Sequence, residues 1–141
     1  MFRSALAILI GLIVILVSVQ AAELLLVAFL NGGLSLDPAT FFGIRNQLSV
    51  LSAKLFYSAL AGIVGGYLTA WIAGRAPVTH GAGLAGVLAV SLAWAAAFST
   101  DARWTPLWVW IALVLIAIPT VIAGAWLRQQ QVAAREPHLA R

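Results

Sequence analysis

Four long apolar runs constrain what this chain can fold into more than any other feature of its sequence. They cover about residues 4–30, 51–74, 80–98 and 106–127. Each is close to, or longer than, the roughly 20 residues that cross a ~30 Å hydrocarbon core. A segment inside a bilayer has no water to bond its backbone, so it must satisfy its own N–H and C=O groups. The runs therefore predict an all-α integral membrane protein, a four-helix bundle with antiparallel up-down topology.

The composition agrees with a membrane protein. Of the 141 residues, 63% are hydrophobic and 9% are charged, which is too little polar surface for a soluble domain of this size. We expect a single transmembrane domain over residues 1–128 and a polar C-terminal tail over residues 129–141. The net charge of +4 does not indicate nucleic-acid binding, because the basic residues lie between apolar runs rather than on one face.

The beginning of the chain has some features of a cleaved signal peptide. Arg3 supplies a basic start, and residues 19–21 form a tolerable cleavage site. The apolar run nevertheless continues to Leu30, past the usual length of a signal-peptide core. We therefore expect a retained first helix.

The basic residues predict the orientation, because the side of a membrane protein richer in Lys and Arg faces the cytoplasm. We expect both termini to be cytoplasmic, in a bacterial inner membrane. The richer side has Arg3, Arg75, Arg128, Arg135 and Arg141, and the other side has Arg45, Arg103 and Lys54 with the acids Asp37 and Asp101. The expected aromatic anchors at the membrane interfaces are Trp71, Trp104, Trp108, Trp110 and Trp126.

The connection over residues 31–47 is the longest and is rich in turn formers. Its second half continues into the second run as FFGIRNQLSVL, residues 41–51. Two arrangements are open for this stretch: a short amphipathic helix along the interface, or an N-terminal extension of the second spanning helix.

Small residues recur at steps of four in the second and third runs. Such strips let helix backbones approach closely in lipid. We expect the two strips to face each other or to face partner helices. Packing within the chain is the simpler interpretation, and an oligomerisation surface is the alternative. The residues are Ser58, Gly62, Gly65, Gly66 and Ala70 in the second run, and Gly81, Ala85, Ala89, Ala93 and Ala97 in the third.

Glu23 is the one acidic residue inside the four runs. A charge in a membrane helix is costly and is usually paired, buried against protein or functional. At ~1.5 Å per residue from the shared side, Glu23 lies about 28 Å along the first helix and Lys54 about 30 Å along the second. The matched depth predicts an ion pair, with Gln20, Tyr57 and Ser58 close by. The alternatives are separate solvation, with Lys54 snorkelling to the interface, and a proton or cation site.

The sequence carries no pattern for catalysis or for a cofactor. It has no cysteine, and His80 and His138 lie at the end of the third run and in the tail, where they cannot ligate a haem within the membrane. The motifs of serine hydrolases, zinc proteases and nucleotide-binding loops are missing. We therefore predict that the protein is not an enzyme and has no metal or other cofactor.

The stretch GGYLTAWIAGRAPVTH, residues 65–80, resembles a broad class of small bacterial membrane proteins of uncharacterised activity. These have four spans and a glycine-rich second helix that ends in a similar Ala-Gly-Arg turn. The resemblance covers about residues 65–90 and implies no activity.

Two functions are open at this point. The first is a non-catalytic accessory or structural subunit within a larger membrane protein complex; respiratory and photosynthetic assemblies hold such subunits, by analogy only. The second is a small homo-oligomeric transporter or channel that uses Glu23 as a proton or cation site. The expected partners are the lipid bilayer and either other membrane subunits or copies of this chain.

Overall fold

A computed structural model describes residues 2–34 and 37–135 of the chain, and within these ranges all regular structure is helical, without strands. Four helices are long and apolar enough to cross a membrane: α1 (Phe2–Asn31), α3 (Leu48–Ala73), α4 (Pro77–Phe98) and α5 (Leu107–Arg135). Two short helices join them, α2 (Pro38–Arg45) and the 3-10 helix η1 (Thr100–Arg103). The prediction of an all-α protein with four span-length helices is confirmed.

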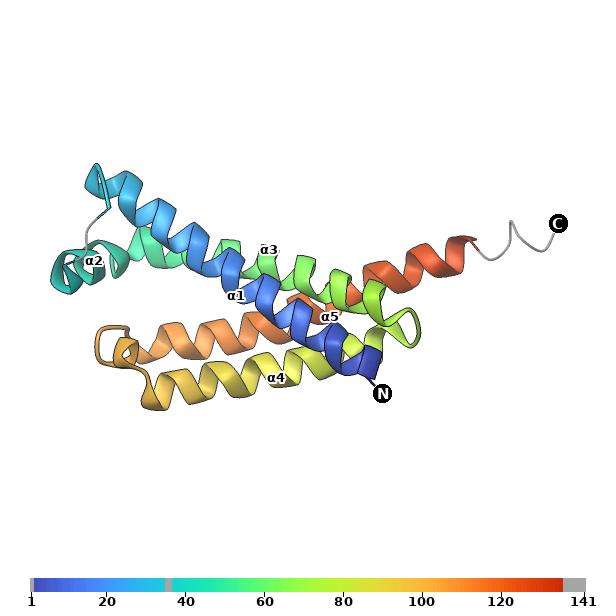
Figure 1. Ribbon diagram of the computed structural model, residues 1–141. Helices are drawn as coiled ribbons and strands as arrows, with labels where there is room; N and C mark the ends of the chain where they lie inside the picture. The colour runs from blue at the N-terminus through green and yellow to red at the C-terminus, as the bar shows by residue number, and fades with distance from the viewer. Residues whose placement is uncertain (1, 35–36, 136–141) are drawn as a thin grey trace.

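The long helices run up and down one bundle (Figure 1). Both short helices, α2 and η1, lie at one end, which we call the α2 end. The start of α1, the turn between α3 and α4 and the last turns of α5 lie at the opposite end, which we call the termini end (Figure 1). Toward the α2 end, α1 diverges from α4 and α5, so the bundle is wider there.

Helix α5 extends further than the sequence indicated. Residues 129–135, which were expected in the polar tail, continue the helix to Arg135. They contain Gln, Val, Ala and Arg but no Gly or Pro, so nothing in this segment stops the helix. Gln131 also accepts a 2.7 Å hydrogen bond from the Tyr67 hydroxyl of α3. The rest of the expected tail, residues 136–141, lies outside the described residues.

The stretch at residues 41–51 is divided between two helices. Its first five residues end α2, and its last four begin α3 after a break at Asn46 and Gln47. Helix α2 begins at Pro38, which suits a first helical position, and Asp37 caps it. The Asp37 carboxylate accepts hydrogen bonds from the Thr40 hydroxyl (2.6 Å) and the Thr40 amide (2.9 Å). These bonds, that of the hydroxyl foremost, hold the pKa of Asp37 below its usual 3.8.

Glycines bring α3 and α5 into backbone contact. A Cβ atom on Gly66 would lie 2.0 Å from the carbonyl oxygen of Val121, and one on Gly124 would lie 2.0 Å from that of Ile63. Gly62, one turn before Gly66, faces the same part of α5. Only glycine permits backbones to approach this closely. The α3 glycines therefore pack against other helices of the same chain.

The two strips of small residues do not face each other along their length. Gly65 of α3 faces α1, where its Cβ would lie 2.4 Å from Cγ1 of Ile15, and Gly81 of α4 faces Ala125 of α5 at the same distance. Ala70 and Ala85 are buried, Ser58 and Ala89 are half-buried, and Ala93 and Ala97 are exposed. The α4 strip thus turns outward toward the α2 end, because α4 contacts its neighbours with a different face there.

The core draws on all four long helices, and the outside is apolar. The main buried cluster is Ile15, Ala61, Leu84, Ala85, Leu88, Ala117 and Val121. Large apolar side chains also cover the surface, with Leu25, Val90 and Leu115 each at least 67% exposed. A surface this apolar matches lipid rather than water. The fold is therefore that of an integral membrane protein.

Four of the five tryptophans expected as interface anchors are exposed, and one is not. Trp71, Trp104, Trp108 and Trp126 are between 46% and 55% exposed. Trp110 is 9% exposed and lies inside the bundle, so its prediction as a surface anchor is wrong. Two residues along a helix turn the side chain by about 200°, so Trp110 points away from the face that carries Trp108.

Candidate functional site

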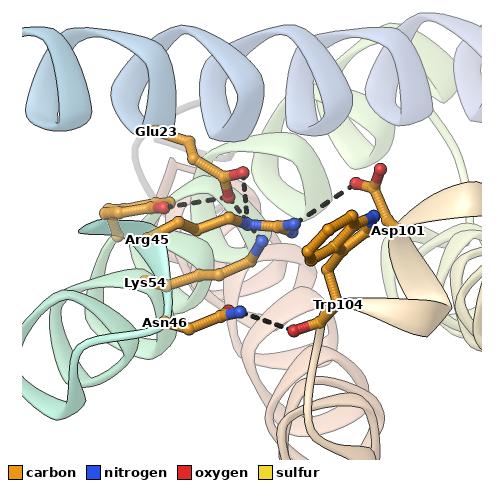
Figure 2. Close-up of polar contacts among 7 residues, drawn as sticks. Glu23, Arg45, Asn46, Lys54, Asp101 and Trp104 are labelled. Carbon is orange, nitrogen blue, oxygen red and sulfur yellow. Dashed lines mark hydrogen bonds and ion pairs between the residues drawn. The ribbon is translucent and has the colours of Figure 1, made fainter. Parts of the chain in front are cut away.

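A buried carboxylate shared by two cations forms the centre of the candidate site. Glu23 of α1 is 4% exposed. Its Oε1 atom lies 2.7 Å from Nε of Arg45, and its Oε2 atom accepts a hydrogen bond from Nζ of Lys54. Figure 2 shows Glu23 reaching from α1 toward Arg45 and Lys54. The structure thus brings together the two residues that the sequence paired by depth, and it adds Arg45.

Arg45 reaches this site because of the local structure around α2. It is the last residue of α2, and the break at Asn46 and Gln47 turns the chain into α3 directly after it. The side-chain amide of Asn46 donates to the backbone carbonyl of Trp104, which ties this junction to the segment after η1 (Figure 2). The Phe42 ring stacks on Trp104 with centroids 5.4 Å apart, and the Arg45 guanidinium lies 5.1 Å from the Phe42 centroid.

A second acid completes the charge balance of the site. Nη1 of Arg45 lies 3.4 Å from Oδ2 of Asp101 in η1 (Figure 2). This contact is longer than the Arg45–Glu23 contact, and the Asp101 side chain is 41% exposed. Two cations and two acids give a formally neutral cluster. Buried ions are tolerated only when they are paired in this way.

The other predicted neighbours of Glu23 take different positions. The Tyr57 hydroxyl lies 3.4 Å from Oε2 of Glu23, at the long end of hydrogen-bond distances. Ser58 Oγ is buried without a hydrogen-bond partner among the described residues. Gln20 is exposed and lines a neighbouring cavity. Only Tyr57 of these three contacts the carboxylate.

A cavity of about 230 Å³ lies next to the charged cluster, between α1, α3, α4 and α5. Its polar wall is at the α2 end of the bundle, and the rest of its wall is apolar. The polar lining residues are Gln20, Arg45, Lys54, Ser58, Ser99 and Asp101. Arg45 and Lys54 line this cavity, whereas Glu23 is not among its lining residues.

Sequence reasoning did not place Arg45 or Asp101 in the site. Both lie in connections between the apolar runs, and helical depth counting applies only within the runs. One signal was present: Arg45 follows Phe41, Phe42 and Ile44, a short apolar stretch that favours a helix lying against the bundle. The residue types at the site offer no metal centre, since in the described part of the chain no three His, Cys, Asp or Glu side chains gather.

Comparison of this chain with protein-family models, with curated proteins and with solved structures finds no match. The class of protein is therefore defined by the fold and the site alone. It is an all-helical integral membrane protein with four span-length helices and a buried charge cluster at one end.

Proposed function

We propose that the protein is a non-catalytic integral membrane protein that serves as an accessory or structural subunit of a larger membrane complex. The observation that carries this proposal is that Glu23 is buried and paired with two cations. Its side chain is 6% exposed, and each carboxylate oxygen already has a cationic partner. A proton or cation carrier must release and rebind its ion, which requires access to water and usually a chain of ionisable groups. A buried carboxylate held by two cations is better suited to joining helices.

The outward face of α4 supports a subunit that packs against other helices. Trp94 and Phe98 are 66% and 69% exposed, with ring centroids 4.3 Å apart. Ala93 and Ala97 are exposed beside them. Gly86, about two turns earlier in α4, is also exposed, and a Cβ on it would meet nothing within 4 Å. Small residues that allow close approach, next to exposed aromatic rings, are the combination used where membrane helices meet a partner.

We further propose that the termini end faces the cytoplasm of a bacterial inner membrane. Arg3, Arg75 and Arg128 lie at that end. At the α2 end, Arg45 and Lys54 are buried and paired with Glu23. Among the described residues, this leaves Arg103 as the exposed basic residue at that end. The difference in exposed positive charge supports this orientation.

Purification from native membranes in a mild detergent, followed by mass spectrometry, tests the subunit proposal. We expect the chain to arrive in fixed ratio with larger membrane proteins. Gly86→Leu, which adds bulk to the open face of α4, should release these proteins. Ala21→Leu, on the exposed side of α1, is the matched control and should retain them.

A chain that arrives alone, or only with copies of itself, would overturn the subunit proposal. The transporter hypothesis would then take its place. Proton or cation flux into vesicles containing the protein or its Glu23→Gln variant would be the measurement to make next.

A further inference from the structure

The cavity beside the charged cluster presents more positive than negative charge. Arg45, Lys54 and Asp101 line it, whereas Glu23 does not. The contact between Arg45 and Asp101 is 3.4 Å long, and Asp101 is partly exposed. An incoming acidic group can therefore take the place of Asp101 at Nη1 of Arg45 without disturbing the contact of Arg45 with Glu23.

The same cavity has polar atoms that lack partners. Ser58 Oγ, Ser99 Oγ and Trp110 Nε1 are buried and have no hydrogen-bond partner among the residues that the structure describes. All three residues line the cavity. Buried polar groups without partners cost stability, and native structures keep few of them. Two hydroxyls and an indole N–H are donors that an anionic head group can use.

The remaining wall is suited to a hydrocarbon chain. It is formed chiefly by Ile15, Leu16, Val19, Leu88, Leu92, Leu113 and Ile116. Leu16 and Gln20 are exposed on α1, so the cavity extends to the lipid-facing surface of the molecule. A cavity of ~150 Å³ holds the six carbons of benzene, so this one, in proportion, holds about nine heavy atoms. That is a carboxylate and the first part of one acyl chain.

We propose that this cavity binds one single-chain anionic amphiphile of the fatty-acid type. Its carboxylate lies against Arg45 and Lys54, and its first methylenes lie along the apolar wall of the cavity. The rest of its chain passes Leu16 into the lipid. The size of the cavity favours one chain over a two-chain phospholipid. A cationic head group is disfavoured by the two basic side chains. This inference does not depend on which proteins accompany the chain in the membrane.

Native mass spectrometry of the full chain in a neutral detergent tests this inference. Dodecanoate should bind at one per chain, and dodecyltrimethylammonium, with the same tail and the opposite charge, should bind about tenfold more weakly or not at all. Acetate and inorganic phosphate, which lack the tail, should not bind. Phosphatidylglycerol, an anionic lipid with two chains, should not displace dodecanoate.

Matched variants locate the binding to this cavity. Ala95 of α4 also lines the cavity. Ala95→Leu therefore fills part of this space and should weaken dodecanoate binding about tenfold or more. Ala97→Leu, on the exposed side of the same helix and outside the cavity, should change it less than about twofold. Asp101→Asn removes the competing acid and should tighten binding severalfold, whereas Ser58→Ala should weaken it severalfold.

Two results would overturn the inference. Equal binding of the anionic and cationic amphiphiles would show that the tail alone determines binding. Equal effects of Ala95→Leu and Ala97→Leu would place the binding elsewhere on the protein. If Ala95→Leu disturbs folding, Asp101→Asn still tests the inference, because it should tighten dodecanoate binding. Ala97→Leu remains the control for a leucine added on the same helix.

Discussion

Glu23 is a single carboxylate shared by Arg45 and Lys54, and this sharing decides how each residue responds to substitution. Removing the acid leaves two buried cations with only the partly exposed Asp101, 3.4 Å from Arg45, to balance them. Removing Lys54 leaves Glu23 still paired with Arg45. The three residues are therefore unequal in their contribution to stability, although they belong to one cluster.

We predict that Glu23→Gln lowers the free energy of unfolding by about 3–5 kcal/mol. It leaves the buried Lys54 without its acidic partner and leaves Arg45 with only its longer contact to Asp101. Lys54→Met should cost about 1–3 kcal/mol, since one charged hydrogen bond is lost while the carboxylate stays neutralised. The double variant should cost less than the sum of the two single changes. Denaturation of the protein in detergent micelles, followed by circular dichroism, measures all three.

Arg103→Gln is the control for this series, because it removes an exposed positive charge at the same end of the molecule. Its effect should stay within about 0.5 kcal/mol. Strict additivity in the double variant, or a Lys54→Met effect as large as that of Glu23→Gln, would contradict the shared-carboxylate interpretation.

Two residues of this cluster could be predicted from the sequence. Glu23 and Lys54 lie in adjacent spans, and the constant helical rise gives their depth from the shared end of the bundle. Arg45 and Asp101 could not be placed in that way, because their positions depend on how two connections fold back onto the bundle. The break at Asn46 and the stacking of Phe42 on Trp104 set that path, and neither leaves a periodic signal.

Among the elements, α3 and α5 have the closest backbone approach that the glycines reveal. Gly66 and Gly124 each place the backbone of one helix against a carbonyl of the other. The repeat of small residues predicted a flat strip on the second span, but the helical period cannot say which neighbour a strip contacts. This strip was expected to face the strip of the third span or partner helices, whereas Gly62 and Gly66 contact α5 and Gly65 contacts α1.

Gly66→Ala should lower the free energy of unfolding by about 1–3 kcal/mol, because its methyl group overlaps the Val121 carbonyl and forces the two helices apart. Gly86→Ala is the matched control on α4, where a Cβ meets no atom within 4 Å. It should leave stability unchanged or raise it by up to about 1 kcal/mol, since alanine restricts the unfolded chain more than glycine does. Equal losses of unfolding free energy in both variants would show that the close approach of α3 and α5 does not determine the effect of Gly66→Ala.

For the molecule as a whole, the even number of span-length helices places the start of α1 and the end of α5 at the same end (Figure 1). The chain has no cysteine, so single cysteines report accessibility without interference. The apolar runs predicted this layout well, because bilayer thickness fixes the length of a span. The extension of α5 to Arg135 was missed, since depth in a membrane says nothing about a helix that continues beyond it.

Single cysteines at Gly33 and at Gln129 test the proposed orientation, since both positions are exposed and they lie toward opposite ends of the bundle. A membrane-impermeant maleimide added to intact spheroplasts should label Gly33→Cys and should label Gln129→Cys only after the membrane is permeabilised. The reverse pattern would place both termini outside the cytoplasm.

The shared carboxylate also bears on how the protein is made. Glu23 leaves the ribosome before either of its cations, and α1 enters the membrane with an acid that nothing yet neutralises. An unpaired acid at the centre of a span costs about 2.5–3.5 kcal/mol on the insertion scale, and the cost falls toward the interface, where Glu23 is expected. The charge of Glu23 is neutralised only after Arg45 and Lys54 have been synthesised. We therefore expect α1 to complete its insertion only after α2 and α3 have been synthesised.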